Sequence, residues 1–223
     1  MDSPLPNSRY ERKFTIRDRA LHDVLALVKR HRAGFREAYP PRMVNNIYLD
    51  TPGLECYRAH VEGAPYRVKT RVRWYGVATG EIPGPVLERK LKRGAVGGKT
   101  AQPLPSVALN GQGVSCLKAA FASADLPESW RATLPFLSPS LFNRYQRRYF
   151  VSADGAFRLT VDTDLSFARA QNVPFPGRQV PCPLIVLELK FKPEHAEAAP
   201  RITNGFPFRI VRCSKYVLGL DTL

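Results

Sequence analysis

Leu184-Ile-Val-Leu-Glu-Leu-Lys-Phe-Lys192 is the stretch of this chain that most clearly predicts a fold. Side chains of a β-strand point in turn to its two faces. One face of this strand would carry Ile185, Leu187, Leu189 and Phe191, and the other would carry Glu188, Lys190 and Lys192. We therefore predict a strand with an apolar face on a core and a mainly cationic opposite face.

The same pattern recurs in five further segments, residues 10–14, 67–74, 87–92, 143–148 and 157–162. In residues 143–148 the charged face would carry Arg144, Gln146 and Arg148. For any single strand, contact with solvent explains such a face, because an antiparallel sheet often buries only one side. Six strands biased toward the same sign are different, since like charges opposite each other destabilise a sheet. A bound polyanion would neutralise them.

The composition fits one large β-rich domain of 223 residues. Lys and Arg number 34 against 19 Asp and Glu, a net charge of +15 that attracts nucleic acid, anionic lipid or phosphorylated small molecules. The four cysteines show no CxxC spacing, and there is no secretory segment and no apolar run of ~20 residues. We expect a cytoplasmic protein with reduced thiols and no membrane segment.

The chain is predicted to form a single domain over residues 9–223, preceded by a disordered segment at 1–8. The predicted connections are a helix over 20–31 capped by Thr15 and Asp18, a hairpin loop over 76–85, a helical insertion over about 104–140 and a closing helix from Cys213. The insertion is too short to bury a core of its own.

Familiar nucleotide and catalytic motifs are excluded by spacing. The glycine-rich run from Gly94 to Thr100 has three residues between its glycines where a phosphate loop needs four, so it indicates at most a flexible loop that brings Lys99 to an anion. The histidines form no i,i+4 pair, and no Ser/His/Asp arrangement is present. Trp74, Phe157 and Phe191 alternate away from the cations, so stacking of nucleic-acid bases on them is not expected.

Glu11, Glu88 and Glu188 share strand faces with cations. Each could pair with a neighbouring Lys or Arg and relieve repulsion. Alternatively, one or more could hold a divalent ion together with substrate phosphates. Glu188 is the preferred metal candidate.

Eight short segments, in this order and spacing, resemble the VTC domain. They are Arg9-Tyr-Glu11-Arg-Lys13-Phe, Tyr48-Leu-Asp50-Thr-Pro52, Arg71-Val-Arg73-Trp-Tyr-Gly76, Glu88-Arg-Lys90, Asn143-Arg144-Tyr, Leu159-Thr-Val-Asp162, Leu187-Glu188-Leu-Lys190 and Cys213-Ser214-Lys215-Tyr216. That family provides the polyphosphate polymerase domain of the vacuolar transporter chaperone complex and is a branch of the triphosphate tunnel metalloenzymes. The resemblance extends from Arg9 to the C-terminus and is to the stand-alone bacterial form.

The resemblance implies an α+β fold in which about eight antiparallel strands form a closed β-barrel, the triphosphate tunnel, with flanking helices. The phosphate-binding and catalytic residues that it implies are Lys13, Arg71, Arg73, Lys90, Arg144, Arg158 and Lys215, joined by Lys69, Lys99, Lys190, Arg212 and Ser214. Glu188 and Glu11 would be the ligands of Mn²⁺ or Mg²⁺. Arg212 replaces a family lysine, which keeps the charge but changes its geometry.

The implied function is that of an ATP-dependent polyphosphate polymerase, a phosphotransferase acting on ATP, triphosphate and polyphosphate. The alternatives are a tripolyphosphatase or nucleoside triphosphatase, and a non-catalytic module that binds polyphosphate or inositol phosphates. Other tunnel enzymes begin with Glu-x-Glu-x-Lys, whereas this chain has Arg9-x-Glu11-x-Lys13, so one metal carboxylate is missing and hydrolysis is less favoured. No nucleic-acid partner is expected, and a membrane-protein partner stays open.

Overall fold

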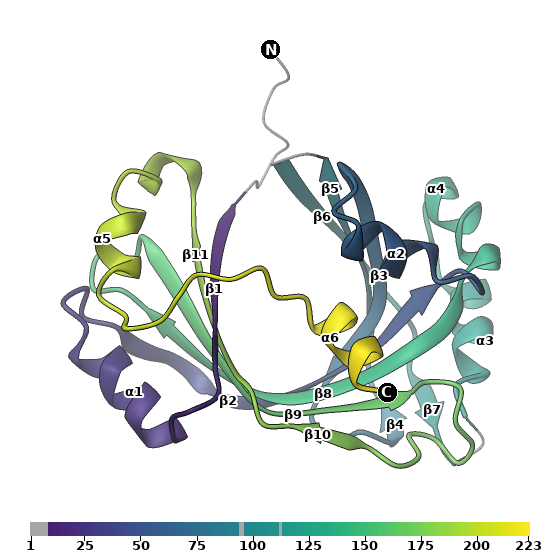
Figure 1. Ribbon diagram of the computed structural model, residues 1–223. Helices are drawn as coiled ribbons and strands as arrows, with labels where there is room; N and C mark the ends of the chain where they lie inside the picture. The colour runs from purple at the N-terminus through teal and green to yellow at the C-terminus, as the bar shows by residue number, and fades with distance from the viewer. Residues whose placement is uncertain (1–8, 94–95, 112) are drawn as a thin grey trace.

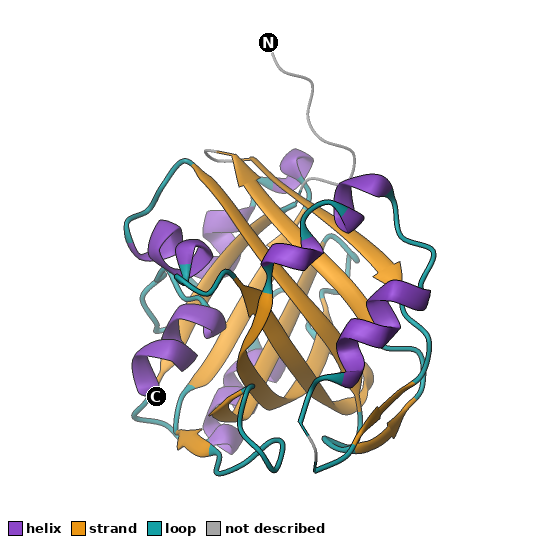
Figure 2. Cartoon of the chain, turned by 90° about the vertical axis from the view of Figure 1, so that its right-hand side faces the viewer, coloured by secondary structure: helices purple, strands orange, loops and turns teal. Residues whose placement is uncertain are grey.

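The protein is described by a computed structural model covering residues 9–93, 96–111 and 113–223. A strongly curved antiparallel sheet dominates it, with α6 and α2 on the concave side and the other helices around the outside (Figure 1). Figure 2 shows the strands crossing the molecule with helices on either side. The predicted disorder of residues 1–8 concerns a segment outside the described residues.

Nine strands of the described residues form the main sheet, in the order β1-β11-β9-β8-β2-β3-β5-β6, with β10 paired to β9. Their bounds are β1 Tyr10–Ile16, β2 Arg36–Asp50, β3 Tyr66–Tyr75, β5 Val86–Arg93, β6 Val96–Pro103, β8 Ser138–Val151, β9 Phe157–Arg169, β10 Val180–Cys182 and β11 Ile185–Phe191. A second, small sheet pairs β4 (Gly80–Ile82) with β7 (Val107–Leu109). The helices are α1 Leu21–Arg30, α2 Glu55–Val61, α3 Cys116–Ser123, α4 Glu128–Arg131, α5 Ala199–Thr203 and α6 Lys215–Thr222, with 3₁₀ turns at Leu134–Phe136 and Pro193–His195.

The closed barrel expected from the sequence is not found in the described residues, where β1 and β6 are the edges of the sheet and no ladder joins them. The edge of β1 is covered by the C-terminal strap, which we define as residues 209–214. Val211 donates its N–H to the carbonyl of Lys13 at 2.8 Å, and Ile210 forms a β-bridge with Phe14. This pairing satisfies backbone groups that an open edge would leave exposed.

The convex face of the sheet packs on two apolar clusters. One joins Ile47, Trp74 and Phe142 of the sheet to Leu117 of α3 and Trp130 of α4. The other joins α1 to the apolar face predicted for β11 and contains Val24, Val28, Phe14, Ile185, Leu187, Leu189 and Phe191. The prediction for the apolar face of residues 184–192 is therefore confirmed.

The concave face carries a third cluster around α6, in which Tyr216 packs with Tyr48, Tyr145 and Val186. The helix expected from Cys213 onward is thus confirmed, and it fills one part of the concave side of the sheet (Figure 1). The rest of that side is lined by charged residues.

Several local predictions are corrected. The helix predicted over 20–31 forms as α1, but Ala20 is its N-cap and makes no side-chain cap, while Thr15 belongs to β1. The predicted hairpin loop over 76–85 contains β4, and the predicted insertion over 104–140 contains β7 as well as helices. Lys99 lies on β6 in register with Lys90, not on a flexible loop, and Gly94 and Ala95 lie outside the described residues.

No helix in residues 9–93, 96–111 and 113–223 combines the length and the apolar character needed to cross a membrane.

Candidate functional site

Strand register decides which charged residues meet on the concave face. Arg73 of β3 lies opposite Asn46 of β2, which lies opposite Asn143 of β8. Arg71 is two residues from Arg73, and side chains two apart in a strand share a face. Lys69 and Arg67 continue the same row, so β3 presents four cations to the concave side.

Arg144 does not share that face, and the expectation that it does is wrong. It lies opposite Asn45, which lies opposite Trp74 of the convex core. Phe142 and Phe150 lie an even number of residues from Arg144 in β8, so all three side chains share one face of the strand. Both phenylalanines are buried in the convex clusters. Because these apolar side chains fix the phase of β8, Tyr145 and Arg147 point to the concave side, and Gln146 and Arg148 point away from it.

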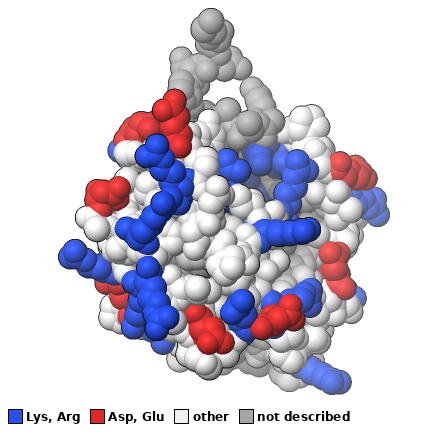
Figure 3. Space-filling view, turned by 60° about the vertical axis from the view of Figure 1, so that its left-hand side comes forward, with Lys and Arg blue, Asp and Glu red and all other residues white. Residues whose placement is uncertain are grey.

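A cavity of about 1290 Å³ opens between β1, β3, β5 and the C-terminal strap. Figure 3 shows Lys and Arg side chains on both sides of a hollow in this part of the molecule. Among the described residues that line the cavity, eight are basic and two are acidic. The basic ones are Arg12, Lys13, Arg17, Arg67, Lys69, Lys90, Lys92 and Arg212, and the acidic ones are Glu11 and Asp221. Such an excess of cations on a concave wall concentrates anions.

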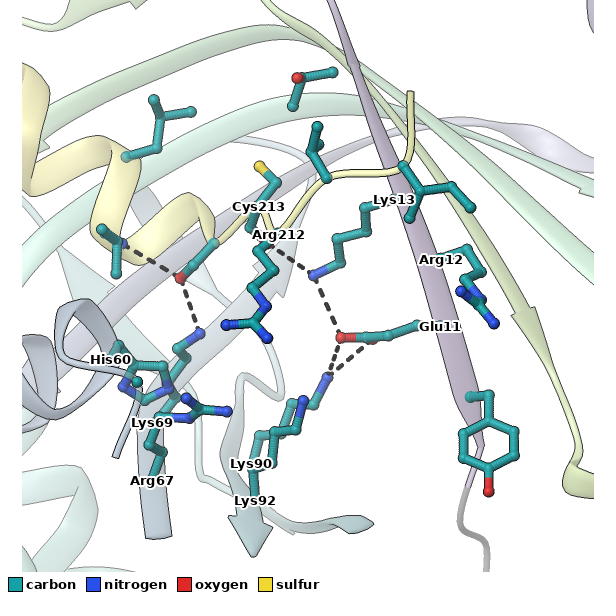
Figure 4. A pocket seen from close by; sticks show the side chains of 18 of the residues that line it. Glu11, Arg12, Lys13, His60, Arg67, Lys69, Lys90, Lys92, Arg212 and Cys213 are labelled. Atoms are coloured by element: carbon teal, nitrogen blue, oxygen red, sulfur yellow. Dashed lines mark hydrogen bonds and ion pairs between the residues drawn. The ribbon is translucent and has the colours of Figure 1, made fainter. Parts of the chain in front are cut away.

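An ion-pair group across the cavity links β1, at one edge of the sheet, to β5, the strand next to the other edge (Figure 4). Lys90 of β5 donates to both carboxylate oxygens of Glu11 on β1 at 3.0 Å, and Lys13 Nζ lies 3.4 Å from Glu11 Oε1. Lys13 also donates to the carbonyl of Cys213 at 3.0 Å. Burial disfavours its charged form, but Glu188 and Glu11 outweigh this and raise the pKa of Lys13. Lys13 therefore stays a cation at neutral pH.

Lys69 holds the C-terminal strap from the β3 side, because its Nζ donates to Ser214 Oγ at 2.8 Å. Burial, together with the charges of Lys13 and Lys90, lowers the pKa of Lys69 to about 7. His60 lies in the same wall, and burial with the charge of Lys69 lowers its pKa to about 4. A phosphate group near Lys69 would restore its full charge, because an anion stabilises the ammonium form.

Deeper on the concave face, Glu88 is surrounded by three cations. Arg71 donates to Glu88 Oε2 through Nε at 2.8 Å and through Nη2 at 2.6 Å, Arg73 Nη1 lies 3.7 Å away, and Lys99 donates to Oε1. Burial raises the pKa of this carboxyl, but Arg71, Arg73 and Lys99 together lower the pKa of Glu88 to about 2. Glu88 thus neutralises part of the cationic wall and orients Arg71.

A second buried group surrounds Asp162 of β9. Arg147 donates to its two oxygens at 2.6 and 2.7 Å, and Lys215 of α6 donates to Oδ2 at 2.6 Å. Glu188 lies nearby, 3.3 Å from Lys190 Nζ and 3.9 Å from Arg147 Nη2. Although burial opposes ionisation, Lys190, Lys13 and Arg147 hold the pKa of Glu188 well below its usual range.

The structure therefore brings most of the predicted site residues to one face. Lys13, Glu11, Lys69, Lys90, Arg212 and Ser214 line the cavity, whereas Arg71, Arg73, Lys99, Glu188, Lys190 and Lys215 belong to the deeper ion-pair groups. Arg158 lies opposite Lys190 at an exposed position of β9. Arg144 is the predicted residue that lies away from them.

Four residues of the concave side are absent from the predicted site. The alternation places Arg67 and Lys92 on the charged faces with Lys69 and Lys90, but they were not named as site residues, although both line the cavity. Arg147 and Tyr145 were missed because the phase of β8 was assigned from its polar residues and not from Phe142. Tyr145 is fully buried, and the charges of Arg147, Arg73 and Lys215 outweigh the effect of burial and lower its pKa to about 8.

The two predicted metal ligands, Glu188 and Glu11, are neighbouring carboxylates. Glu188 lies opposite Lys13, and Glu11 is two residues from Lys13, so both acids are on the concave face of adjacent strands. The described residues contain no group of three or more His, Cys, Asp and Glu side chains that could hold a metal ion. This donor set fits Mg²⁺ or Mn²⁺ only where substrate phosphates supply further oxygens, as these ions commonly require.

A family model for the VTC domain matches residues 8–223. The chain belongs to the VTC domain family. A comparison of this VTC domain with curated proteins finds no match.

Solved structures share the fold of this VTC domain at low sequence identity. A candidate adenylate cyclase from Vibrio parahaemolyticus is 13% identical with a TM-score of 0.53, covering 95% of this chain and 97% of its own. A protein from Pyrococcus horikoshii is 12% identical with a TM-score of 0.52, over 95% and 99% of the two chains. A candidate adenylyl cyclase from Hippeastrum, described as having a dominant triphosphatase activity, is 14% identical with a TM-score of 0.52, over 96% and 95%.

Asp50 belongs to one of the segments that resemble the VTC family, and its role in this structure is structural. The buried carboxylate of Asp50 accepts hydrogen bonds from the N–H groups of Thr51, Cys56 and Tyr57 at 2.7, 2.9 and 2.9 Å. The hydroxyl of Tyr216 on α6 also donates to it. Asp50 therefore fastens α2 and α6 to the end of β2 and lies outside the cationic groups.

Proposed function

We propose that this VTC domain is a metal-dependent phosphotransferase that takes the γ-phosphoryl group of ATP and adds it to a polyphosphate chain. The observation that carries the proposal is the excess of cations around the cavity, eight basic against two acidic residues. Membership of the VTC domain family supports a substrate with linked phosphates. Phosphoryl transfer needs mainly positioning and charge stabilisation, which such a surface supplies.

Arg71 and Arg73 are the residues proposed to hold the phosphates deepest in the site. Both guanidinium groups are ordered by other side chains, Arg71 by Glu88 and Arg73 by a 2.8 Å hydrogen bond from its Nε to Asn46 Oδ1. An ordered guanidinium loses little freedom when it binds phosphate and can offer two parallel donors. Glu88 would then compete with the substrate for the same cations.

Lys13, Lys69, Arg212 and Ser214 are proposed to hold the next phosphates at the mouth of the cavity. Lys13 and Lys69 already contact the C-terminal strap through Cys213 and Ser214. A phosphate chain in this position would bind β1, β3 and the strap together. Binding would fix the strap and keep water away from the transferring group.

Glu188 and Glu11 are the proposed ligands of Mn²⁺ or Mg²⁺, together with oxygens of the bound phosphates. The ion would neutralise charge that develops on the transferring phosphoryl group. Without substrate, the two carboxylates are neutralised by Lys13, Lys90 and Lys190. The charges of Lys190, Lys13 and Arg147 thus keep Glu188 ionised.

Hydrolysis is the second candidate, favoured by the structural likeness to the Hippeastrum protein described as a triphosphatase. The purified protein is incubated with ATP and Mn²⁺, and the products are separated by length. Long phosphate chains with ADP are expected. Orthophosphate without chains would replace the polymerase proposal with the hydrolase, and unchanged ATP would refute both and leave a binding module.

A matched pair of variants shows whether the concave face is responsible. Arg73→Ala removes a cation from the proposed site, and Arg30→Ala removes one from an exposed position of α1. Turnover should fall at least a hundredfold in the first variant and stay at the wild-type level in the second. Equal effects would mean that net charge, and not this site, supports the activity.

A further inference from the structure

A cluster of tyrosines and one arginine lies where the cationic rows end. Tyr39 and Tyr75 are 57% and 51% exposed, although both are large aromatic residues. Arg42 places its guanidinium carbon 5.5 Å from the ring centre of Tyr39 and 5.9 Å from that of Tyr75. Tyr149 meets Tyr39 edge to face, with ring centres 5.8 Å apart and an interplanar angle of 89°. We call these four residues the tyrosine cluster.

The sequence builds this cluster through an irregularity in β2. Tyr39 and Arg42 are three residues apart and would point to opposite faces of a regular strand. Pro40 and Pro41 lie between them, and the register with β8 shifts on both sides of Tyr39. As a result Tyr39 lies opposite Tyr149 and Arg42 opposite Arg147, two residues of β8 that share a face. Bulges that re-aim side chains in this way are common beside functional sites.

The tyrosine cluster continues the cationic face directly. Tyr75 is two residues from Arg73 and four from Arg71, so all three share a face of β3. Tyr75 is the last residue of β3, and Arg67, near the other end of the strand, lines the cavity. Tyr149 is likewise two residues from Arg147 on β8. Four residues of strand span ~13 Å, so a molecule with phosphates on Arg71 and Arg73 would place a group of nucleoside size at the tyrosines.

We propose that the tyrosine cluster binds the base of a nucleoside triphosphate whose phosphates lie on Arg73 and Arg71. This rests on the proposed function and extends it, because it makes a nucleotide, and not a bare phosphate chain, the preferred donor. The exposed faces of Tyr39 and Tyr75 offer stacking surfaces, and Arg42 offers a guanidinium plane for the same purpose. Stacking tolerates every base, so the site selects nucleotides as a class.

Calorimetric binding of ATP and of inorganic tripolyphosphate, both in EDTA to prevent turnover, tests this inference. Wild type, Tyr39→Ala, Tyr75→Ala and the double variant are compared. Tyr66→Ala is the control, since Tyr66 lies on the same strand and is 54% exposed at its other end. We expect each single variant to weaken ATP binding roughly tenfold and to leave tripolyphosphate binding unchanged, while Tyr66→Ala changes neither.

The outcomes distinguish failure of the proposed base site from failure of the proposed function. Wild type that binds tripolyphosphate as tightly as ATP, or tyrosine variants that retain wild-type affinity for ATP, would overturn the base site and leave the proposed function standing. Wild type that binds neither ligand would overturn both. Equal loss of both ligands in a folded variant would also overturn the base site, because the tyrosines would then act on the phosphates. Retention of ATP binding in Tyr39→Phe and Tyr75→Phe would support stacking over hydrogen bonding.

Discussion

Replacement of Glu88 by glutamine removes the carboxylate that pairs with Arg71, Arg73 and Lys99. The side chain is 7% exposed, so solvent screens the interaction little. Folding lowers the pKa of this carboxyl from 4.5 to about 2, which corresponds to ~3 kcal/mol of stability at neutral pH. We expect Glu88→Gln to lower the free energy of unfolding by about that amount, because three cations lose their counter-charge.

Urea denaturation with and without tripolyphosphate measures the effect. Because the folded pKa is depressed, the contribution of Glu88 is complete above about pH 4.5 and is lost as the pH falls toward about 2. Glu88→Gln should lack that part of the acid sensitivity. Tripolyphosphate should stabilise the variant more than wild type, since the ligand replaces the missing negative charge.

The control is Glu197→Gln, which removes a carboxylate from an exposed position. Its stability should stay within ~0.5 kcal/mol of wild type. If Glu88→Gln matched this control, and tripolyphosphate stabilised it no more than wild type, then Glu88 would not balance the cations and the electrostatic account of the site would be wrong.

Further predictions concern single residues on either side of the sheet. Arg71→Ala should abolish the rise in melting temperature that tripolyphosphate gives to wild type, whereas Arg30→Ala should retain it; an unchanged rise in Arg71→Ala would remove Arg71 from the site. Leu189→Lys buries an unpaired charge in the convex core and should give insoluble or unfolded protein, so a soluble, folded variant in circular dichroism would contradict the face assigned to Leu189. Glu188→Gln should bind ATP yet lose Mn²⁺-dependent turnover, and wild-type rates at every Mn²⁺ concentration would exclude Glu188 as a metal ligand. Tripolyphosphate binding should take up a proton near pH 7 in wild type but not in Lys69→Met, because Lys69 is partly neutral there without ligand; calorimetry in buffers of different ionisation enthalpy measures the difference.

Much of the fold could be predicted from strand alternation. Leu187 and Leu189 lie on the convex core as expected, because a strand buried on one face must keep its apolar residues in phase. The prediction failed at β8. Arg144 and Arg148 suggested that their face of the strand is the concave one, but Phe142 and Phe150 lie on the same face and are buried in the convex core. Burial of two phenylalanines in the core outweighs the placement of arginines whose long side chains can reach solvent from either face.

The sequence by itself determined the antiparallel sheet, the excess of cations on one face and the family to which these patterns belong. Only the tertiary structure decided how the sheet ends, with the C-terminal strap along β1, and which charges meet. Glu11 reaches Lys90 and Lys69 reaches Ser214 across 79 and 145 residues of chain. Alternation fixes the face on which a side chain lies because it depends on neighbouring residues alone. Partners across the cavity depend on curvature and on the packing of α6, which arise from the whole chain at once.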